Sequence, residues 1–224
     1  MGTQEVRPSF YALRPGGWRD YVTLLHLPYT AWHLSYVAVG AAIAPHFHLD
    51  RLGWALLAFF LAMGVAAHAL DELKGRPLRT RIPDRVLVAL GVAGVAAAAA
   101  IGVAAAIAWG YGLLAFIVVG AVLVPAYNLE LALHNDVGFA LAWGAFPVLT
   151  GYFVEAQTLR LDAIGVAVYA FALSLAQRAL STPVRRARRE SATTAGTEPL
   201  ERALRLLTLA AVALSVALVA ARLP

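Results

Sequence analysis

The chain has 224 residues, of which 61% are hydrophobic and only 14% are charged. Soluble domains are about half apolar and about a quarter charged, so this composition excludes an ordinary soluble protein and indicates that part of the solvent is lipid. A net charge of +5 would suggest nucleic acid as the partner of a soluble protein. Here the basic residues occupy short segments between apolar stretches, and we expect no nucleic-acid partner. The absence of cysteine excludes disulfides, thiolate metal sites and cysteine nucleophiles.

The chain begins with a polar tail, residues 1–21, in which no short apolar core precedes a small-residue cleavage site, so we expect no cleavable signal peptide. Residues 22–224 are predicted to form a single polytopic transmembrane helical domain, because about 20 apolar residues cross a bilayer as a helix. The uncharged stretch 86–129 is too long for one span and contains a natural turn between Trp109 and Gly112. The seven predicted spans are residues 22–45, 52–70, the two halves of 86–129, 137–154, 161–180 and 203–221.

The lysines and arginines predict how the spans are oriented. Fourteen of the 18 lie in the N-terminal tail and in or beside two loops, whereas Arg51, Arg160 and Arg222 lie on the opposite side. We therefore expect a multi-pass protein of the cell (inner or plasma) membrane with a cytoplasmic N-terminus and an external C-terminus. The predicted cytoplasmic loops are residues 71–85, 127–136 and 182–202, and the small polar segment Ser191–Pro199 is predicted to be disordered.

Ionisable residues at membrane depth concentrate after the second span, and such residues often mark a functional path. His68, Asp71 and Glu72 stand at i, i+3 and i+4, which places them on one helical face if the helix continues that far. A histidine and two carboxylates are reasonable ligands for a divalent ion, and the basic residues that follow are candidates for holding phosphate. The alternative is an interfacial charge cluster that ends the span and sets its topology.

The segment after the sixth span is rich in arginine and contains no aspartate. Arg178 lies about a turn inside the predicted helix and is expected to point into a cavity mouth as part of an anion-binding rim. For the run from Arg185 to Arg189 we favour a different interpretation, in which the arginines are attracted to anionic lipid headgroups. The loop 127–136 carries ionisable groups without lysine or arginine, and is either an acidic patch that pairs with basic loops or a solvated connector.

On the first span His26, Tyr29, His33 and Tyr36 repeat at i, i+3, i+7 and i+10, which is one helical stripe. Polar and aromatic stripes in membrane helices face a cavity or another helix more often than lipid. Two histidines a heptad apart also raise haem ligation as an alternative, which would need a facing histidine such as His68.

This arrangement resembles the UbiA-type prenyltransferases, all-helical membrane proteins that have nine spans around a central cavity and aspartate-rich motifs after the second and sixth spans. The family's first motif runs NDxxDxxxD. Here the segment Ala67–Gly75 (AHALDELKG) falls in register, with Asp71 at the central aspartate, His68 at the first and Gly75 at the last. The fifth span, Leu141–Tyr152, is similar to the family's glycine-rich fifth helix. This chain is shorter by two spans and has arginines where the second aspartate motif should be.

The resemblance implies an all-α integral membrane fold of about seven transmembrane helices around a central cavity, and transfer or binding of an isoprenyl diphosphate or other lipid. In the enzymes Mg²⁺ bridges the aspartate motifs and the diphosphate, whose departure must be stabilised. The alternatives are a non-catalytic protein of the same fold that binds a lipid, a quinone or a partner helix, and a haem-binding protein. The residues implied are catalytic His68, Asp71 and Glu72, of which Asp71 and Glu72 would hold Mg²⁺; diphosphate-binding Lys74, Arg76, Arg79 and Arg178; and cavity-lining His26, Tyr29, Trp32, His33 and Tyr36.

Overall fold

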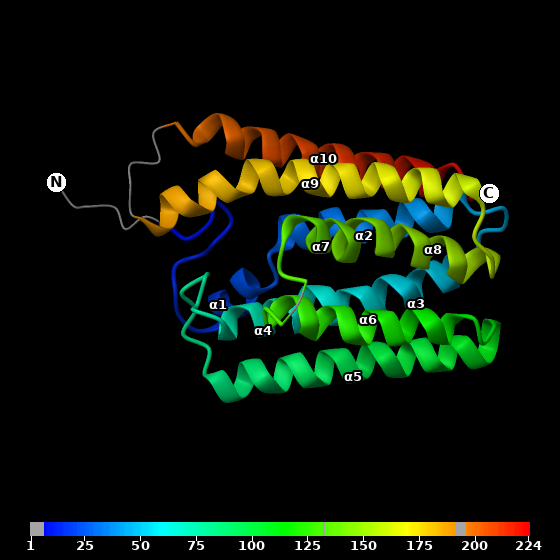
Figure 1. Ribbon diagram of the computed structural model, residues 1–224, viewed down its shortest axis with the longest axis horizontal. Coiled ribbons are helices and arrows are strands. Elements are labelled where there is room, and N and C mark those ends of the chain that lie inside the picture. The colour runs from blue at the N-terminus through cyan, green and yellow to red at the C-terminus, as the bar shows by residue number, and fades with distance from the viewer. Residues whose placement is uncertain (1–6, 132, 191–195) are drawn as a thin grey trace.

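The computed structural model describes residues 7–131, 133–190 and 196–224, and within these ranges every regular element is a helix. Most of the helices run side by side along one long axis, with α10 at one side of the bundle and α5 at the other (Figure 1). The elements are α1 (Trp18–Leu24), α2 (Leu27–Ile43), α3 (Leu49–Phe59), η1 (Phe60–Ala67), α4 (His68–Leu73), α5 (Asp84–Trp109), α6 (Leu113–Asn128), α7 (Asp136–Ala140), η2 (Leu141–Ala145), α8 (Phe146–Ala156), α9 (Leu161–Arg189) and α10 (Glu198–Ala220).

Some of these elements join into longer rods, in which a π-helical segment continues an α-helix. In this way α3, η1 and α4 form one rod, Leu49–Leu73, and α7, η2 and α8 form another, Asp136–Ala156. With α5, α9 and α10, five helices in the described part of the chain are long and apolar enough to cross a membrane. The helix α6 is apolar but has only 16 residues. The composition therefore predicted the class correctly: the chain is all-helical, with several potential spans.

The faces that the helices turn outward are apolar. On α5, Val92 and Ile107 are 65% and 69% exposed, and on α10 Leu209 is 64% exposed. A soluble protein would have to cover such surfaces, whereas lipid tails solvate them at no cost. The helices α2 and α8 differ from these: most residues of each are buried, and α2 packs against both α8 and α10.

The two ends of the bundle differ in charge. The segment before α1, the loop between α4 and α5, the end of α9 and the start of α10 all lie at one end, and the C-terminus lies at the other (Figure 1). These are the segments whose basic residues were predicted to share one side of the membrane. The connection from α6 to α7 is set back from that end, within the bundle (Figure 1). Of the segment predicted to be disordered, residues 191–195 lie outside the described residues, and Glu198 and Pro199 already begin α10.

Candidate functional site

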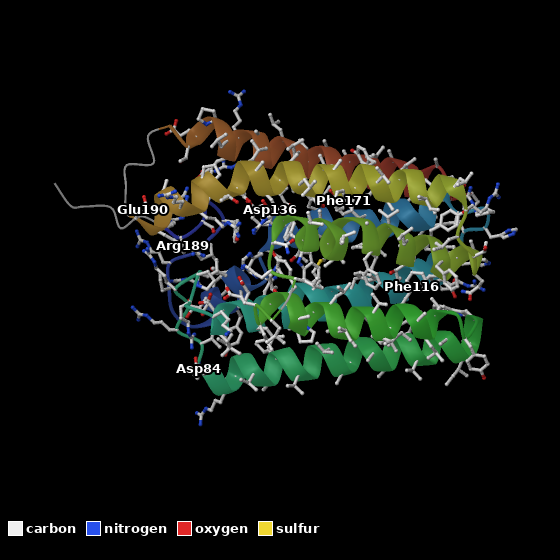
Figure 2. The ribbon with its side chains drawn as sticks, viewed as in Figure 1. Asp84, Phe116, Asp136, Phe171, Arg189 and Glu190 are labelled. Carbon is white, nitrogen blue, oxygen red and sulfur yellow. The ribbon has the colours of Figure 1, made fainter. Side chains whose placement is uncertain are left out.

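A cluster of polar side chains lies within the basic end of the bundle. Figure 2 shows polar side chains at the end that holds Arg189 and Glu190 and, set back from it, around Asp136, whereas Phe116 lies farther along the bundle. The centre of the cluster is a pair of histidines. The rings of His26 and His68 are stacked, with their centroids 4.0 Å apart and their planes 13° from parallel.

The backbone and hydrogen-bond partners of these histidines define their orientation. His26 directly precedes α2 with a left-handed φ of 46°, which is uncommon for a residue other than glycine and is often found at functional sites. His68 Nδ1 is 3.1 Å from the carbonyl oxygen of Gly64, so this nitrogen carries the proton and Nε2 is left as an acceptor. His26 Nδ1 is 2.8 Å from the hydroxyl of Tyr11. Burial raises the pKa of the Tyr11 phenol above its usual value, so this group stays protonated at neutral pH.

Asp71 follows His68 by one helical turn and lies among cations. Its carboxylate interacts electrostatically with Arg185 and Arg189 from the end of α9, and with His134 from the segment before α7. The first and second loops singled out in the sequence are therefore brought to one place. The spacing of His68 and Asp71 did not predict this approach; it was implied only by the resemblance, in which both motifs hold one diphosphate.

Arg178 lies deeper in the bundle than the arginines at the end of α9. Its Nε donates a hydrogen bond to Asp136 Oδ1 at 2.9 Å, and its guanidinium lies over the ring of Phe139 at 5.2 Å. The side chain of Arg178 is only 14% exposed. The acidic loop 127–136 thus pairs with a basic segment through Asp136, as one of the two interpretations of that loop expected.

From the sequence Arg185 was expected, with the run to Arg189, to be attracted to anionic lipid headgroups, and it was not predicted to bind diphosphate. It is exposed to solvent, yet it interacts electrostatically with Asp71, Tyr29 and Tyr127, which come from three other helices. Its spacing from Arg178 was the signal that could have revealed it, because residues seven apart on a helix share a face.

Glu72 has a role that its sequence position did not suggest. Its side chain is fully buried, and its two carboxylate oxygens accept hydrogen bonds from the loop that follows α4. The backbone N–H groups of Leu78 and Thr80 and the hydroxyl of Thr80 all lie 2.9 Å from these oxygens. The carboxylate therefore organises the loop, and its oxygens are already engaged.

The residues of this region do not form a preformed metal site. In the described ranges no three histidine, aspartate or glutamate side chains come together in a way that would hold an ion. With Glu72 engaged by the loop, Asp71 is the carboxylate that remains for Mg²⁺. A single carboxylate binds this ion mainly together with the phosphate oxygens of a substrate.

The three predicted diphosphate ligands in the loop have different environments. Arg76 donates to the carbonyl oxygen of Ile82 at 2.6 Å and pairs with the carboxylate of Asp84, so its guanidinium closes the loop. Lys74 and Arg79 are exposed.

The predicted cavity-lining stripe of α2 divides into two parts. Tyr29 packs edge-on against Tyr11, with ring centroids 5.7 Å apart, next to the histidine pair. The deeper residues are buried between helices: Trp32 Nε1 donates to the hydroxyl of Tyr36 at 2.6 Å, and His33 Nδ1 donates to the carbonyl oxygen of Trp143 at 2.8 Å.

An apolar cavity of about 120 Å³ lies between α3, η1, α5, α6 and the rod of η2 and α8. Residues that line it include Phe59, Met63, Phe116, Val124, Trp143 and Phe146. None of the five residues predicted to line a cavity (His26, Tyr29, Trp32, His33 and Tyr36) is among the residues lining this one. Tyr127 connects the two regions, because its ring lies 5.8 Å from that of Trp143 on one side and 4.8 Å from that of His134 on the other.

The polar cluster and the apolar cavity thus adjoin through the rings of Tyr127 and Trp143. Compared with known protein families, characterised proteins and solved structures, the chain shows no significant match. The resemblance to UbiA-type prenyltransferases therefore stays a prediction from the motif and the placement of the loops.

Proposed function

We propose that this protein binds an isoprenyl diphosphate, or another lipid with a phosphate head, with the head in the polar cluster and the tail in the apolar cavity. The observation that carries the proposal is a contact between the two regions: Trp143 lines the cavity and packs against Tyr127, which interacts electrostatically with Arg185 in the polar cluster. In the full proposal the chain has seven spans, its N-terminus is cytoplasmic, and its arrangement is UbiA-like.

The head would be recognised mainly by arginine. A guanidinium binds phosphate oxygens with two parallel N–H groups and remains charged under all physiological conditions. Arg185 is accessible and would be the first contact, and Arg178 would follow by exchanging part of its interaction with Asp136 for the phosphate. Tyr29 and Tyr127 interact electrostatically with Arg185 and complete the rim.

The resemblance extends the proposal to transfer of the prenyl group to an apolar or aromatic acceptor. Mg²⁺, held by Asp71 together with the diphosphate oxygens, would neutralise the negative charge of the leaving group. A second candidate is binding without catalysis. It is favoured by one observation: both oxygens of Glu72 are engaged by the loop, which leaves fewer carboxylate ligands than the enzymes use.

Thermal unfolding of the detergent-purified protein with geranylgeranyl diphosphate, with and without Mg²⁺, tests the proposal. A ligand that binds only the folded state adds about 2.7 kcal/mol of stability when its concentration is about 100 times its Kd. We expect stabilisation in the wild type and a clear loss of it in Arg185→Ala. Arg186→Ala is the matched control, because Arg186 is the next residue on α9 and is 79% exposed in a pair with Glu190.

The four outcomes have different meanings. Stabilisation that requires Mg²⁺ would support the enzyme, and formation of pyrophosphate with added acceptors should follow. Stabilisation without Mg²⁺ would support arginine-based binding. Equal responses of the Arg185 and Arg186 variants would contradict the assigned head site. No response with shorter, equal or longer prenyl diphosphates would sink the proposal.

Haem binding stays the third alternative. The ring faces of His26 and His68 are in contact, so an iron between their nitrogens would require the pair to separate. A Soret band in the purified protein would be its signature, and a colourless preparation that rebinds no haem would exclude it.

A further inference from the structure

The N-terminal segment enters the polar cluster and is held there at several points. The backbone N–H of Leu13 donates to Thr23 Oγ1 at 3.0 Å, and Arg188 donates to the carbonyl oxygen of Arg7 at 2.8 Å. Between these anchors Phe10 lies under the guanidinium of Arg205, 4.6 Å from its ring centroid. Tyr11 is the residue that this segment places against His26.

The hydrogen bond between Tyr11 and His26 sets the protonation of the imidazole. A phenol is a stronger donor than a neutral imidazole, and an imidazole nitrogen is a stronger acceptor than a phenol oxygen. The proton of Tyr11 is therefore directed to His26 Nδ1, 2.8 Å away. In a neutral imidazole the nitrogen that does not accept must carry the hydrogen, so His26 presents an Nε2–H donor.

This donor has no acceptor among the residues that the structure describes. His26 Nε2 is shielded from solvent and makes no hydrogen bond within the described residues. A buried donor without a partner is rare in native structures and calls for an explanation such as a missing ligand. The surroundings suit an anion, since His26 interacts electrostatically with Arg185. The neighbouring ring, His68, already uses its own donor on Gly64.

We infer that Tyr11 is a positioning residue, which holds His26 in the Nε2–H form so that this N–H donates to a phosphate oxygen of the bound head. The inference rests on the proposed function for its ligand. It adds a neutral donor to the arginines and makes the N-terminal segment part of the site. A neutral N–H group can donate to a phosphate oxygen but not to a cationic lipid headgroup, so it favours phosphate. It does this without adding positive charge to a region already rich in arginine.

The test combines two substitutions with two measurements. Tyr11→Phe removes only the hydroxyl and keeps the ring that packs against Phe10 and Tyr29. Tyr21→Phe is the matched control, because Tyr21 is 45% exposed on α1. His26→Gln supplies a side-chain N–H donor that does not depend on Tyr11.

The first measurement is ¹⁵N NMR of histidine-labelled protein without ligand, with the His26 signal assigned by its loss in His26→Gln. We expect an unprotonated Nδ1 in the wild type and in Tyr21→Phe, and a shift toward protonated Nδ1 in Tyr11→Phe. An unchanged tautomer in Tyr11→Phe would overturn the role of Tyr11, whether or not the protein binds a diphosphate.

The second measurement is the apparent Kd of geranylgeranyl diphosphate from thermal shifts. We expect Tyr11→Phe to weaken binding about tenfold in the wild-type background and to have little effect in the His26→Gln background. Equal losses in both backgrounds would mean that Tyr11 only packs, and the inference would fail while the proposed function stood. If the wild type binds no prenyl diphosphate, the proposed function and the ligand of His26 both fail, and the NMR result alone decides the role of Tyr11.

Discussion

The backbone of Val148 on α8 lies so close to Gly40 on α2 that a Cβ atom added at Gly40 would be 2.1 Å from the Val148 carbonyl oxygen. The relationship is reciprocal, since a Cβ atom at Gly151 of α8 would be 2.1 Å from the carbonyl oxygen of Val37 on α2. Two helices in lipid gain stability mainly by packing, and glycine lets their backbones meet. This crossing therefore positions α2, with His26 at its start, against the rest of the bundle.

Gly40→Ala and Gly151→Ala are expected to destabilise the protein by about 3 kcal/mol or more, because the clash is with backbone and cannot be relieved by a rotamer change. Gly53→Ala and Gly165→Ala are the controls. Both positions are helical and have open space around the added Cβ, so each should be neutral or stabilising by up to about 1 kcal/mol. Thermal unfolding in one detergent measures all four. Normal stability of Gly40→Ala would show that the two helices do not cross this closely.

Glu72→Gln is expected to destabilise the loop that follows α4. A hydrogen bond to a charged group contributes about 1.5–3 kcal/mol, and the amide presents an N–H₂ group where the carboxylate accepted from the backbone. We expect faster hydrogen exchange at the amides of Leu78 and Thr80, together with a lower unfolding temperature. Glu190→Gln, in an exposed pair, should change stability by less than about 1 kcal/mol. If Glu72→Gln behaved like Glu190→Gln, the carboxylate would not organise the loop.

Arg188 joins three parts of the protein, so its loss should loosen all of them. Its Nε donates to Glu201 Oε1 at 2.8 Å, with side chains only 12% and 10% exposed, and its NH1 holds the carbonyl oxygen of Arg7. Removing one partner leaves a poorly solvated charge, which costs about 3 kcal/mol. We expect Arg188→Ala to lower the unfolding temperature and to speed proteolysis before α1. Arg186→Ala should change neither, and equal behaviour of the two variants would contradict this assignment.

The orientation in the membrane is testable because the chain has no cysteine of its own. Arg160 and Arg186 are exposed at the two opposite ends of the bundle, and each can be replaced by a single cysteine. With basic segments on the cytoplasmic side, an impermeant maleimide added to intact cells should label Arg160→Cys and not Arg186→Cys. Permeabilised cells should label both. The reverse pattern in intact cells would place the N-terminus outside.

Much of the fold could be predicted from the order of apolar and charged residues. The long uncharged stretch 86–129 is divided at the predicted turn, since α5 ends at Trp109 and α6 begins at Leu113. The basic segments do gather at one end of the bundle (Figure 1). The local breaks were not predictable in this way: the π-helical segments η1 and η2 depend on packing against neighbouring helices and leave no mark in the hydropathy.

The candidate site was predictable only in part. The spacing of His68 and Asp71 predicted that they share one helical face, and Asp71 does lie near Arg185 and Arg189; their role in binding stays a prediction. By spacing, Glu72 lies on the same helical face as His68, but its oxygens accept hydrogen bonds from the following loop. The conformation of that loop cannot be predicted from the periodicity of the helix. Tyr11 belongs to the segment predicted to be a polar cytoplasmic tail, and only the folded chain brings its hydroxyl to His26.

The sequence by itself determined that much of the surface is apolar and that the basic residues fall in a few segments. Hydropathy and charge are properties of each side chain and do not depend on the tertiary fold. The tertiary structure decided which polar residues meet. His26 and His68 stack, and Arg185 interacts with Asp71, because α2, α4 and the end of α9 converge at one end of the bundle. That convergence depends on how closely the helices cross. At Gly40 and Gly151 the backbone of the partner helix occupies the space of a side chain, and only the tertiary structure shows this contact.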